Sequence, residues 1–134
     1  MATKAHLVWT NELQFIARVG DGPAVVMDSH DGGSGSSPME LVLMGLGGCT
    51  AMDVISILKK KRANVTRFEL YLSGERAEEH PRRYTDIHIE YVFYGKGIKP
   101  KDVARSIELS EEKYCGARAS LNANITSSYR IEEE

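Results

Sequence analysis

The chain has 134 residues, enough for one domain with a hydrophobic core and too few for two domains of ordinary size. Hydrophobic residues make up 42% and charged residues 27% of the sequence, which is ordinary for a globular protein. The net charge of −2 and the isoelectric point of about 6.1 argue against a nucleic-acid partner held by phosphate contacts. We therefore expect a single domain over residues 1–134.

The apolar segments of the sequence predict neither a secretory signal nor a membrane span. Residues 1–10 lack a long apolar stretch and a small-residue cleavage site. The longest apolar run, Met39 to Gly48, contains Glu40 and is shorter than the roughly 18 residues that a span needs. We expect a cytoplasmic protein with no membrane partner, and in that reducing compartment two cysteines favour free thiols or a redox couple.

The first part of the chain predicts strands. Turn signals at Asn11-Glu12 and at Gly20 to Pro23 separate short apolar segments from one another. A flexible loop rich in glycine and serine then runs over residues 31–37. The predicted strands cover residues 5–9, 14–19 and 24–27.

A long helix follows this loop. Ser37 is a suitable N-cap, Pro38 suits the first helical position, and Glu40 completes a capping box with Ser37. We expect the helix to run to about Arg62, since the basic residues 59–62 suit the negative end of its dipole. The first half is almost wholly apolar and should be buried on nearly all sides.

The second part of the chain predicts α+β architecture. Residues 65–73 and 84–94 alternate between apolar and polar side chains, as half-buried antiparallel strands do. Pro100 begins a second helix, a third short helix spans Cys115 to Ala123, and residues 125–131 form a last strand. Because strands and helices come in blocks, we expect an antiparallel sheet with a long central helix.

The stretch GLGGCTAMDV places Cys49 on a weakened helix. Each glycine there costs about 1 kcal/mol of helix stability relative to alanine. Leu41, Gly45, Cys49 and Met52 are spaced by three or four residues and lie along one stripe. Some group therefore approaches the helix closely at Cys49. One interpretation is a structural thiol at a tight helix crossing; the other is a reactive thiol.

Cys115 makes the reactive interpretation stronger. It begins a short predicted helix, where the dipole and the free N–H groups favour the thiolate. If folding brings the two cysteines together, the pair suits a thiol peroxidase, in which one sulfur becomes a sulfenic acid and the other condenses with it. Sequence spacing alone does not establish that proximity.

The motifs SPMELVLMGLGGC and SEEKYC together resemble the OsmC/Ohr family of thiol-dependent hydroperoxide reductases, and most closely its YhfA-type branch. The resemblance implies an OsmC-like α+β fold and an intertwined homodimer with two long central helices. It assigns Cys49 as the peroxidatic thiol and Cys115 as the resolving thiol. It also implies organic hydroperoxides as substrates and a dithiol or a lipoylated protein as the reductant.

In the peroxidase branches, an arginine and a glutamate lie against the reactive thiol, because a guanidinium stabilises a thiolate and a carboxylate orients the guanidinium. By resemblance, Arg18 and Glu40 are the candidates for these positions. The family's glutamate directly follows the helix-opening proline, where this chain has Met39. Glu40 also serves as a capping-box partner, and Arg18 is equally explained as an outward charge on a strand.

The remaining polar residues predict no metal ion and no cofactor. The four histidines are scattered, with no pair at ligand spacing and no CxxC motif. Asp53 follows Cys49 by four residues, so it faces the same site or its edge, and a carboxylate there raises a thiol pKa. Pairing with a base on a dimer partner is the alternative role for Asp53.

Three functional hypotheses follow. The first is an organic hydroperoxide reductase whose site is lined by the apolar residues Leu41, Met44, Leu46 and Met52. The second is a non-catalytic dimer that binds a small apolar ligand in an interface pocket. The third is a redox sensor, whose disulfide changes shape without turnover.

Overall fold

The computed structural model describes all 134 residues, and these form two compact units. The N-terminal unit is Met1–Val42 and the C-terminal unit is Leu43–Glu134. The single domain expected over residues 1–134 stays a prediction.

The N-terminal unit contains a three-stranded antiparallel sheet in the order β1-β2-β3. Phe15 on the central strand lies opposite Trp9 on one neighbour and Met27 on the other. Many large apolar side chains of this unit are exposed, and Trp9 retains 64% of its accessible surface. The strands are β1 (Ala5–Asn11), β2 (Gln14–Val19) and β3 (Val25–Met27).

Helix α1 (Pro38–Lys60) begins with the predicted capping box. The backbone N–H of Ser37 donates to Glu40 Oε1 at 2.7 Å, and the N–H of Glu40 donates to Ser37 Oγ at 3.2 Å. The helix ends two residues before the expected Arg62, which adopts φ 57° in the left-handed region. This residue takes the place that glycine usually has after a helix.

Helix α1 is long and apolar enough to cross a membrane by length and composition, with 23 residues and a mean hydropathy of 1.9 over its most apolar window. The expectation of no membrane span considered uninterrupted apolar runs alone, and it stays a prediction. Beyond Gly48 only Thr50, Asp53 and Ser56 interrupt the apolar residues before the basic end of the helix, so its most apolar window stays hydrophobic. The core helix of a globular protein passes the same test.

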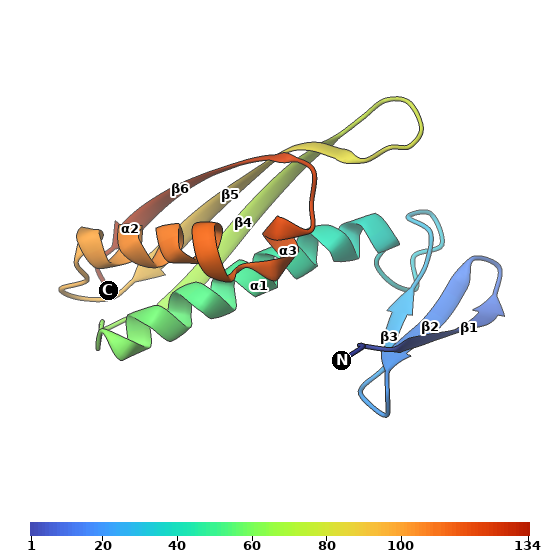
Figure 1. Ribbon diagram of the computed structural model, residues 1–134, viewed down its shortest axis with the longest axis horizontal. Helices are drawn as coiled ribbons and strands as arrows, with labels where there is room; N and C mark the ends of the chain where they lie inside the picture. The colour runs from blue at the N-terminus through green and yellow to red at the C-terminus, as the bar shows by residue number, and fades with distance from the viewer. The chain divides into compact units, whose positions relative to one another are not determined.

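In the C-terminal unit, α1 and the helical segment of residues 100–119 lie on one face of a three-stranded sheet (Figure 1). Side chains that alternate along the central strand, Ile87, Ile89, Tyr91 and Phe93, are buried on that face. The sheet has the order β4-β5-β6, and its strands are β4 (Arg67–Arg76), β5 (Tyr84–Tyr94) and β6 (Asn124–Glu132).

The sheet is mixed, whereas the sequence analysis expected an antiparallel sheet. Strand β5 pairs antiparallel with β4, as its alternation predicted, but parallel with β6. The reason lies in the connection, because β5 and β6 are joined by a helical crossover, and such a crossover brings the chain back in the same direction.

That crossover contains an element that the sequence analysis missed. It comprises α2 (Pro100–Leu109), the π-helical turn η1 (Ser110–Tyr114) and α3 (Gly116–Ala119). The expected helix over Cys115 to Ala123 is therefore shortened to four residues, and Cys115 is its N-cap. The SEEKY segment, expected only as a lead into this helix, is itself the π turn.

The glycines of α1 have different surroundings. A Cβ on Gly47 would lie 2.8 Å from Leu72 Cδ1 of β4, so this glycine permits the helix to pack closely on the sheet. A Cβ added at Gly45 or Gly48 would have no atom within 4 Å other than those of its chain neighbours and the helix's own backbone. The close approach is therefore present at Gly47, which points about 200° around the helix from Cys49 and so faces the sheet and not the thiol.

Candidate functional site

The structure brings Cys49, Asp53 and Cys115 together. The two sulfur atoms and a carboxylate oxygen of Asp53 all lie within 4.8 Å of one another. Cys49 and Asp53 are four residues apart on α1 and so share a face of the helix, while Cys115 comes from the end of the π turn. Both cysteines are free; Cys49 is half-buried and Cys115 is only 5% exposed.

The π turn positions Cys115. The N–H of Cys115 donates to the carbonyl oxygen of Ser110, five residues earlier, at 2.8 Å. Cys115 itself is extended (φ −75°, ψ 98°), and the backbone N–H of Arg118 donates to Cys115 Sγ at 3.4 Å. A turn of this kind, widely associated with functional sites, thus directs the second thiol at α1.

The protonation of Cys115 differs from the sequence-based expectation. Burial raises the pKa of the Cys115 thiol, and neighbouring Cys49 and Asp53 raise it further, outweighing the lowering effect of the Arg118 N–H. The expectation that a helix start favours the thiolate was wrong here, because α3 has only four residues and desolvation outweighs its N–H groups. Asp53, which the sequence placed beside Cys49, contributes the smallest of these effects on the pKa of Cys115.

A chain of hydroxyl groups connects this site to the core. Ser110 Oγ donates to Asp53 Oδ2 at 2.9 Å and lies 2.9 Å from Thr50 Oγ1, which lies 2.8 Å from the Tyr91 hydroxyl. Since each hydroxyl has one proton, Tyr91 donates to Thr50 and Thr50 donates to Ser110. Burial raises the pKa of Tyr91 to about 12, so it remains a donor at neutral pH. The chain fixes α1, the π turn and β5 to one another.

Two charged residues near Cys115 were missed by the sequence analysis. Arg118 Nη1 lies 4.0 Å from Glu111 Oε1 and has no hydrogen-bond partner although the atom is buried, while Nη2 donates to the carbonyl of Ile125 at 3.2 Å. Glu111 in turn accepts a hydrogen bond from Ser127 Oγ at 2.7 Å. Arg118 could have been identified from its position in the sequence, because it follows Cys115 by three residues.

Arg18 and Glu40 both belong to the N-terminal unit. Glu40 is engaged in the capping box, and its carboxylate lies 3.7 Å from His30 Nδ1, an interaction that lowers its pKa less than the Ser37 hydrogen bonds do. Arg18 is exposed on β2 and borders an apolar cavity of about 400 Å³. The role of either residue beside Cys49 stays a prediction.

The apolar residues expected to line the thiol site are distributed differently. Leu46 is buried in the core of the C-terminal unit, whereas Met44 and Met52 are 50% and 73% exposed. A cavity of about 230 Å³ borders the site instead, with a mixed lining of Asp53, Ser56, Ile57, Lys60 and Tyr114.

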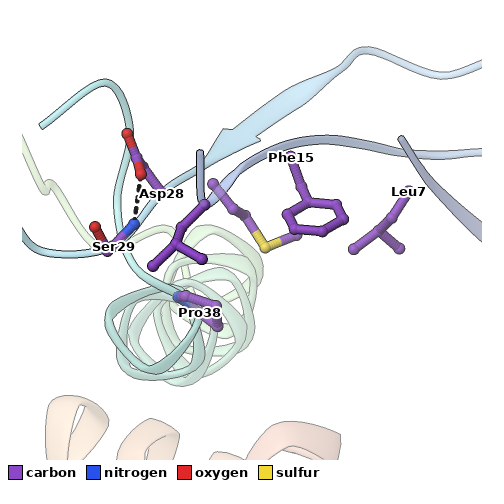
Figure 2. Close-up of a pocket in the computed structure, with 7 residues that line it drawn as sticks. Leu7, Phe15, Asp28, Ser29 and Pro38 are labelled. Carbon is purple, nitrogen blue, oxygen red and sulfur yellow. Dashed lines mark hydrogen bonds between the residues drawn. The ribbon is translucent and has the colours of Figure 1, made fainter. Parts of the chain in front are cut away.

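The N-terminal unit has an apolar cavity of about 320 Å³ of its own (Figure 2). Leu7 and Phe15 reach into it from the sheet, and Pro38 borders it at the start of the helix. At its polar edge, the N–H of Ser29 donates to Asp28 Oδ1 at 2.7 Å. Serine hydrogen bonds lower the pKa of Asp28, so this carboxylate is ionised at neutral pH.

Comparison with known proteins places this chain in a family. Residues 30–130 match the sequence model of the OsmC-like proteins. Protein YhfA of Escherichia coli K12 is 42% identical over 130 residues, which cover 96% of this chain and 97% of that protein. These matches span both cysteines.

Solved structures agree with this comparison. A hypothetical protein from Aquifex aeolicus VF5 is 34% identical, with a TM-score of 0.84 over 98% of both chains. The organic hydroperoxide resistance protein OhrB of Bacillus subtilis has the same fold at 14% identity, with a TM-score of 0.63 over 97% of this chain and 98% of that one.

The hydroxyl chain predicts the effect of Tyr91→Phe. Removal of this buried donor leaves Thr50 bonded only to Ser110, so the free energy of unfolding should fall by about 1 kcal/mol. Urea unfolding at a fixed protein concentration measures the change. Tyr129→Phe, which removes a more exposed hydroxyl, should change stability by less than about 0.5 kcal/mol. Equal effects of the two variants would contradict the role given to the chain.

Proposed function

Because the chain belongs to the family of OsmC-like proteins, we propose that it is a thiol-dependent peroxidase that reduces organic hydroperoxides. The observation that carries the proposal is the proximity of the two sulfur atoms, which lie within 4.8 Å although they are remote in sequence. OhrB of Bacillus subtilis is an organic hydroperoxide resistance protein, which supports the same chemistry, though the likeness to that protein concerns the fold.

Exposure supports the assignment of the two thiols. Cys49 is half-buried, so a peroxide can reach it from solvent, whereas Cys115 is buried behind it. The Cys49 thiolate attacks the O–O bond, becomes a sulfenic acid and releases an alcohol. Cys115 then attacks the sulfenic sulfur, a disulfide forms, and water leaves.

A dithiol or a lipoylated protein is the proposed reductant. It returns both cysteines to thiols by two successive exchange steps through a mixed disulfide. The cytoplasm is the proposed location, since its reducing conditions keep the resting pair as thiols. Arg18 and Glu40 are proposed to stabilise the Cys49 thiolate as the family's arginine and glutamate do.

A homodimer is also part of the proposal. Exposed apolar side chains occur in both units, among them Trp9, Leu13 and Val19 on the N-terminal one and Met44 and Met52 on the C-terminal one. Large exposed apolar surface favours a protein interface. Positions 45 and 48 of α1, open in the single chain, offer space for a closely packed neighbour.

A second candidate function is a binding module for a small apolar ligand. The apolar cavity of the N-terminal unit favours it, with Leu7, Phe15, Met27 and Pro38 in its lining and Asp28 at its edge. In that case the thiols are inert toward peroxides, while an apolar probe such as a long-chain alcohol raises the thermal midpoint of the protein.

Serine variants test the peroxidase directly. Reduced protein is mixed with cumene hydroperoxide, free thiols are counted, and products are mapped by mass spectrometry. The wild type should form a Cys49–Cys115 disulfide faster than free cysteine reacts. Cys49→Ser should fall to the rate of free cysteine, and Cys115→Ser should retain a sulfenic acid at Cys49. Wild-type thiols that survive the peroxide would refute the proposal.

The pH dependence of disulfide closure follows from Cys115. Because burial raises its pKa above the ordinary 9.0, the thiolate fraction at neutral pH is small and grows about tenfold per pH unit. Closure after a rapid peroxide pulse should therefore accelerate from pH 7 to pH 9 without levelling off. Acid-quenched mass spectrometry follows the loss of the sulfenic acid. A plateau near pH 7 would instead indicate a lowered pKa.

Met52→Glu tests the homodimer. A charge at this exposed apolar position of α1 should shift the protein toward the monomer, because burying it in an interface requires desolvation. Light scattering after size exclusion gives the mass. Lys96→Glu, in the exposed turn after β5, is the control and should leave the mass unchanged. A wild type that is monomeric at all tested concentrations contradicts this part of the proposal.

A further inference from the structure

We propose that, in the reduced protein, Cys49, Asp53 and Cys115 bind one borderline-soft divalent cation of the Zn²⁺ and Cd²⁺ class. The three side chains supply two sulfur atoms and one carboxylate oxygen from a single unit of the fold. Metal binding at this place is independent of the peroxidase activity; only its regulatory consequence, given below, rests on the proposed function.

The geometry fits a tetrahedral ion. The three donor atoms lie within 4.8 Å of one another. Bond lengths of about 2.3 Å to sulfur and about 2.1 Å to oxygen place tetrahedral ligands about 3.6–3.8 Å apart. Small side-chain rotations therefore suffice to close the three donors on one ion. Three protein ligands leave a fourth position open for water or for an exogenous ligand.

The charge of the cluster favours a cation. Two thiols and a carboxylate gather at one point, and no lysine or arginine lies within salt-bridge distance of the Asp53 carboxylate. Two thiolates beside this carboxylate would repel one another. A divalent cation offsets that repulsion and stabilises both thiolates.

The surroundings of the three donors resemble a second coordination sphere. Ser110 Oγ donates to Asp53 Oδ2 at 2.9 Å, and the Thr50–Tyr91 chain holds Ser110 in turn. The backbone N–H of Arg118 donates to Cys115 Sγ at 3.4 Å. Hydrogen bonds of this kind orient metal ligands and leave the other carboxylate oxygen available to the ion.

The three proposed ligands follow no known metal-binding motif, so sequence analysis could not identify this site. Two of them share a helix face at a spacing of four residues, and the third reaches them only through the π turn. The prediction of no metal relied on scattered histidines and the lack of CxxC, and it did not consider a cysteine pair joined by tertiary structure.

Binding is a proton exchange without electron transfer. The cation displaces one proton from each thiol, and both protons go to solvent. Given the proposed function, the ion slows the reaction of the two cysteines with hydroperoxide, because both thiolates are coordinated. A hydroperoxide that oxidises the bound dithiolate takes two electrons and two protons, gives an alcohol, water and the disulfide, and releases the cation.

Metal titration of the reduced protein without oxygen tests the proposal. Cd²⁺ should give a thiolate charge-transfer absorption that saturates at one ion per chain, and Zn²⁺ should compete for the same site. Cys49→Ser and Cys115→Ser should each abolish this absorption at stoichiometric metal. Asp53→Asn should weaken binding at least about tenfold, and Ser110→Ala about 10- to 100-fold.

Asp86→Asn is the matched control, since this carboxylate lies on the opposite, exposed face of the sheet and should leave the affinity unchanged. Circular dichroism verifies that each variant is folded. Protein oxidised to the disulfide should bind no metal. Absence of saturable binding by the reduced wild type, or equal affinity of the wild type and Asp53→Asn, would overturn the proposal.

The outcomes separate the two proposals. Metal binding by a protein whose thiols do not react with cumene hydroperoxide supports the metal site and refutes the peroxidase. Rapid peroxide turnover with no metal binding refutes only the metal site.

Discussion

The hydrogen bond between Ser110 and Asp53 joins the two halves of the thiol site. Ser110 closes the end of α2 and also supplies the carbonyl that accepts from Cys115, while Asp53 lies one helical turn after Cys49. Ser110 therefore holds both the backbone at Cys115 and the Asp53 carboxylate beside Cys49. Ser110 is fully buried, so this end of the hydrogen bond is shielded from water, whereas Asp53 is half-buried.

The site has a consistent electrostatic character. Desolvation and the neighbouring Cys49 and Asp53 raise the pKa of Cys115, and the hydrogen bond from Ser110 orients the Asp53 carboxylate. The same arrangement favours a protonated Cys115 at rest, which suits both a resolving thiol and a metal site that exchanges protons for an ion. Peroxide chemistry and metal binding are thus two expected properties of one cluster.

Local patterns in the sequence predicted local structure well. The Ser37–Glu40 capping box and the alternation along β5 were read correctly because neighbouring residues determine them. The parallel pairing of β6 with β5 was missed, because the sequence analysis grouped strands and helices in blocks and did not consider β5, the following helices and β6 as one strand–helix–strand unit. The raised pKa of Cys115 was missed because burial depends on residues far away in sequence. The motif resemblance selected both cysteines, and proximity in space required the fold.

The π turn has a consequence for how this segment can vary. Its hydrogen bond spans five residues, from the Cys115 N–H to the Ser110 carbonyl, and the side chains between them include the exposed Glu112, Lys113 and Tyr114. Exchange of those side chains leaves the bond intact. Deletion of one residue would convert the turn to an ordinary helical one and rotate the thiol by about 100° away from α1. The segment therefore tolerates changes of composition far better than changes of length.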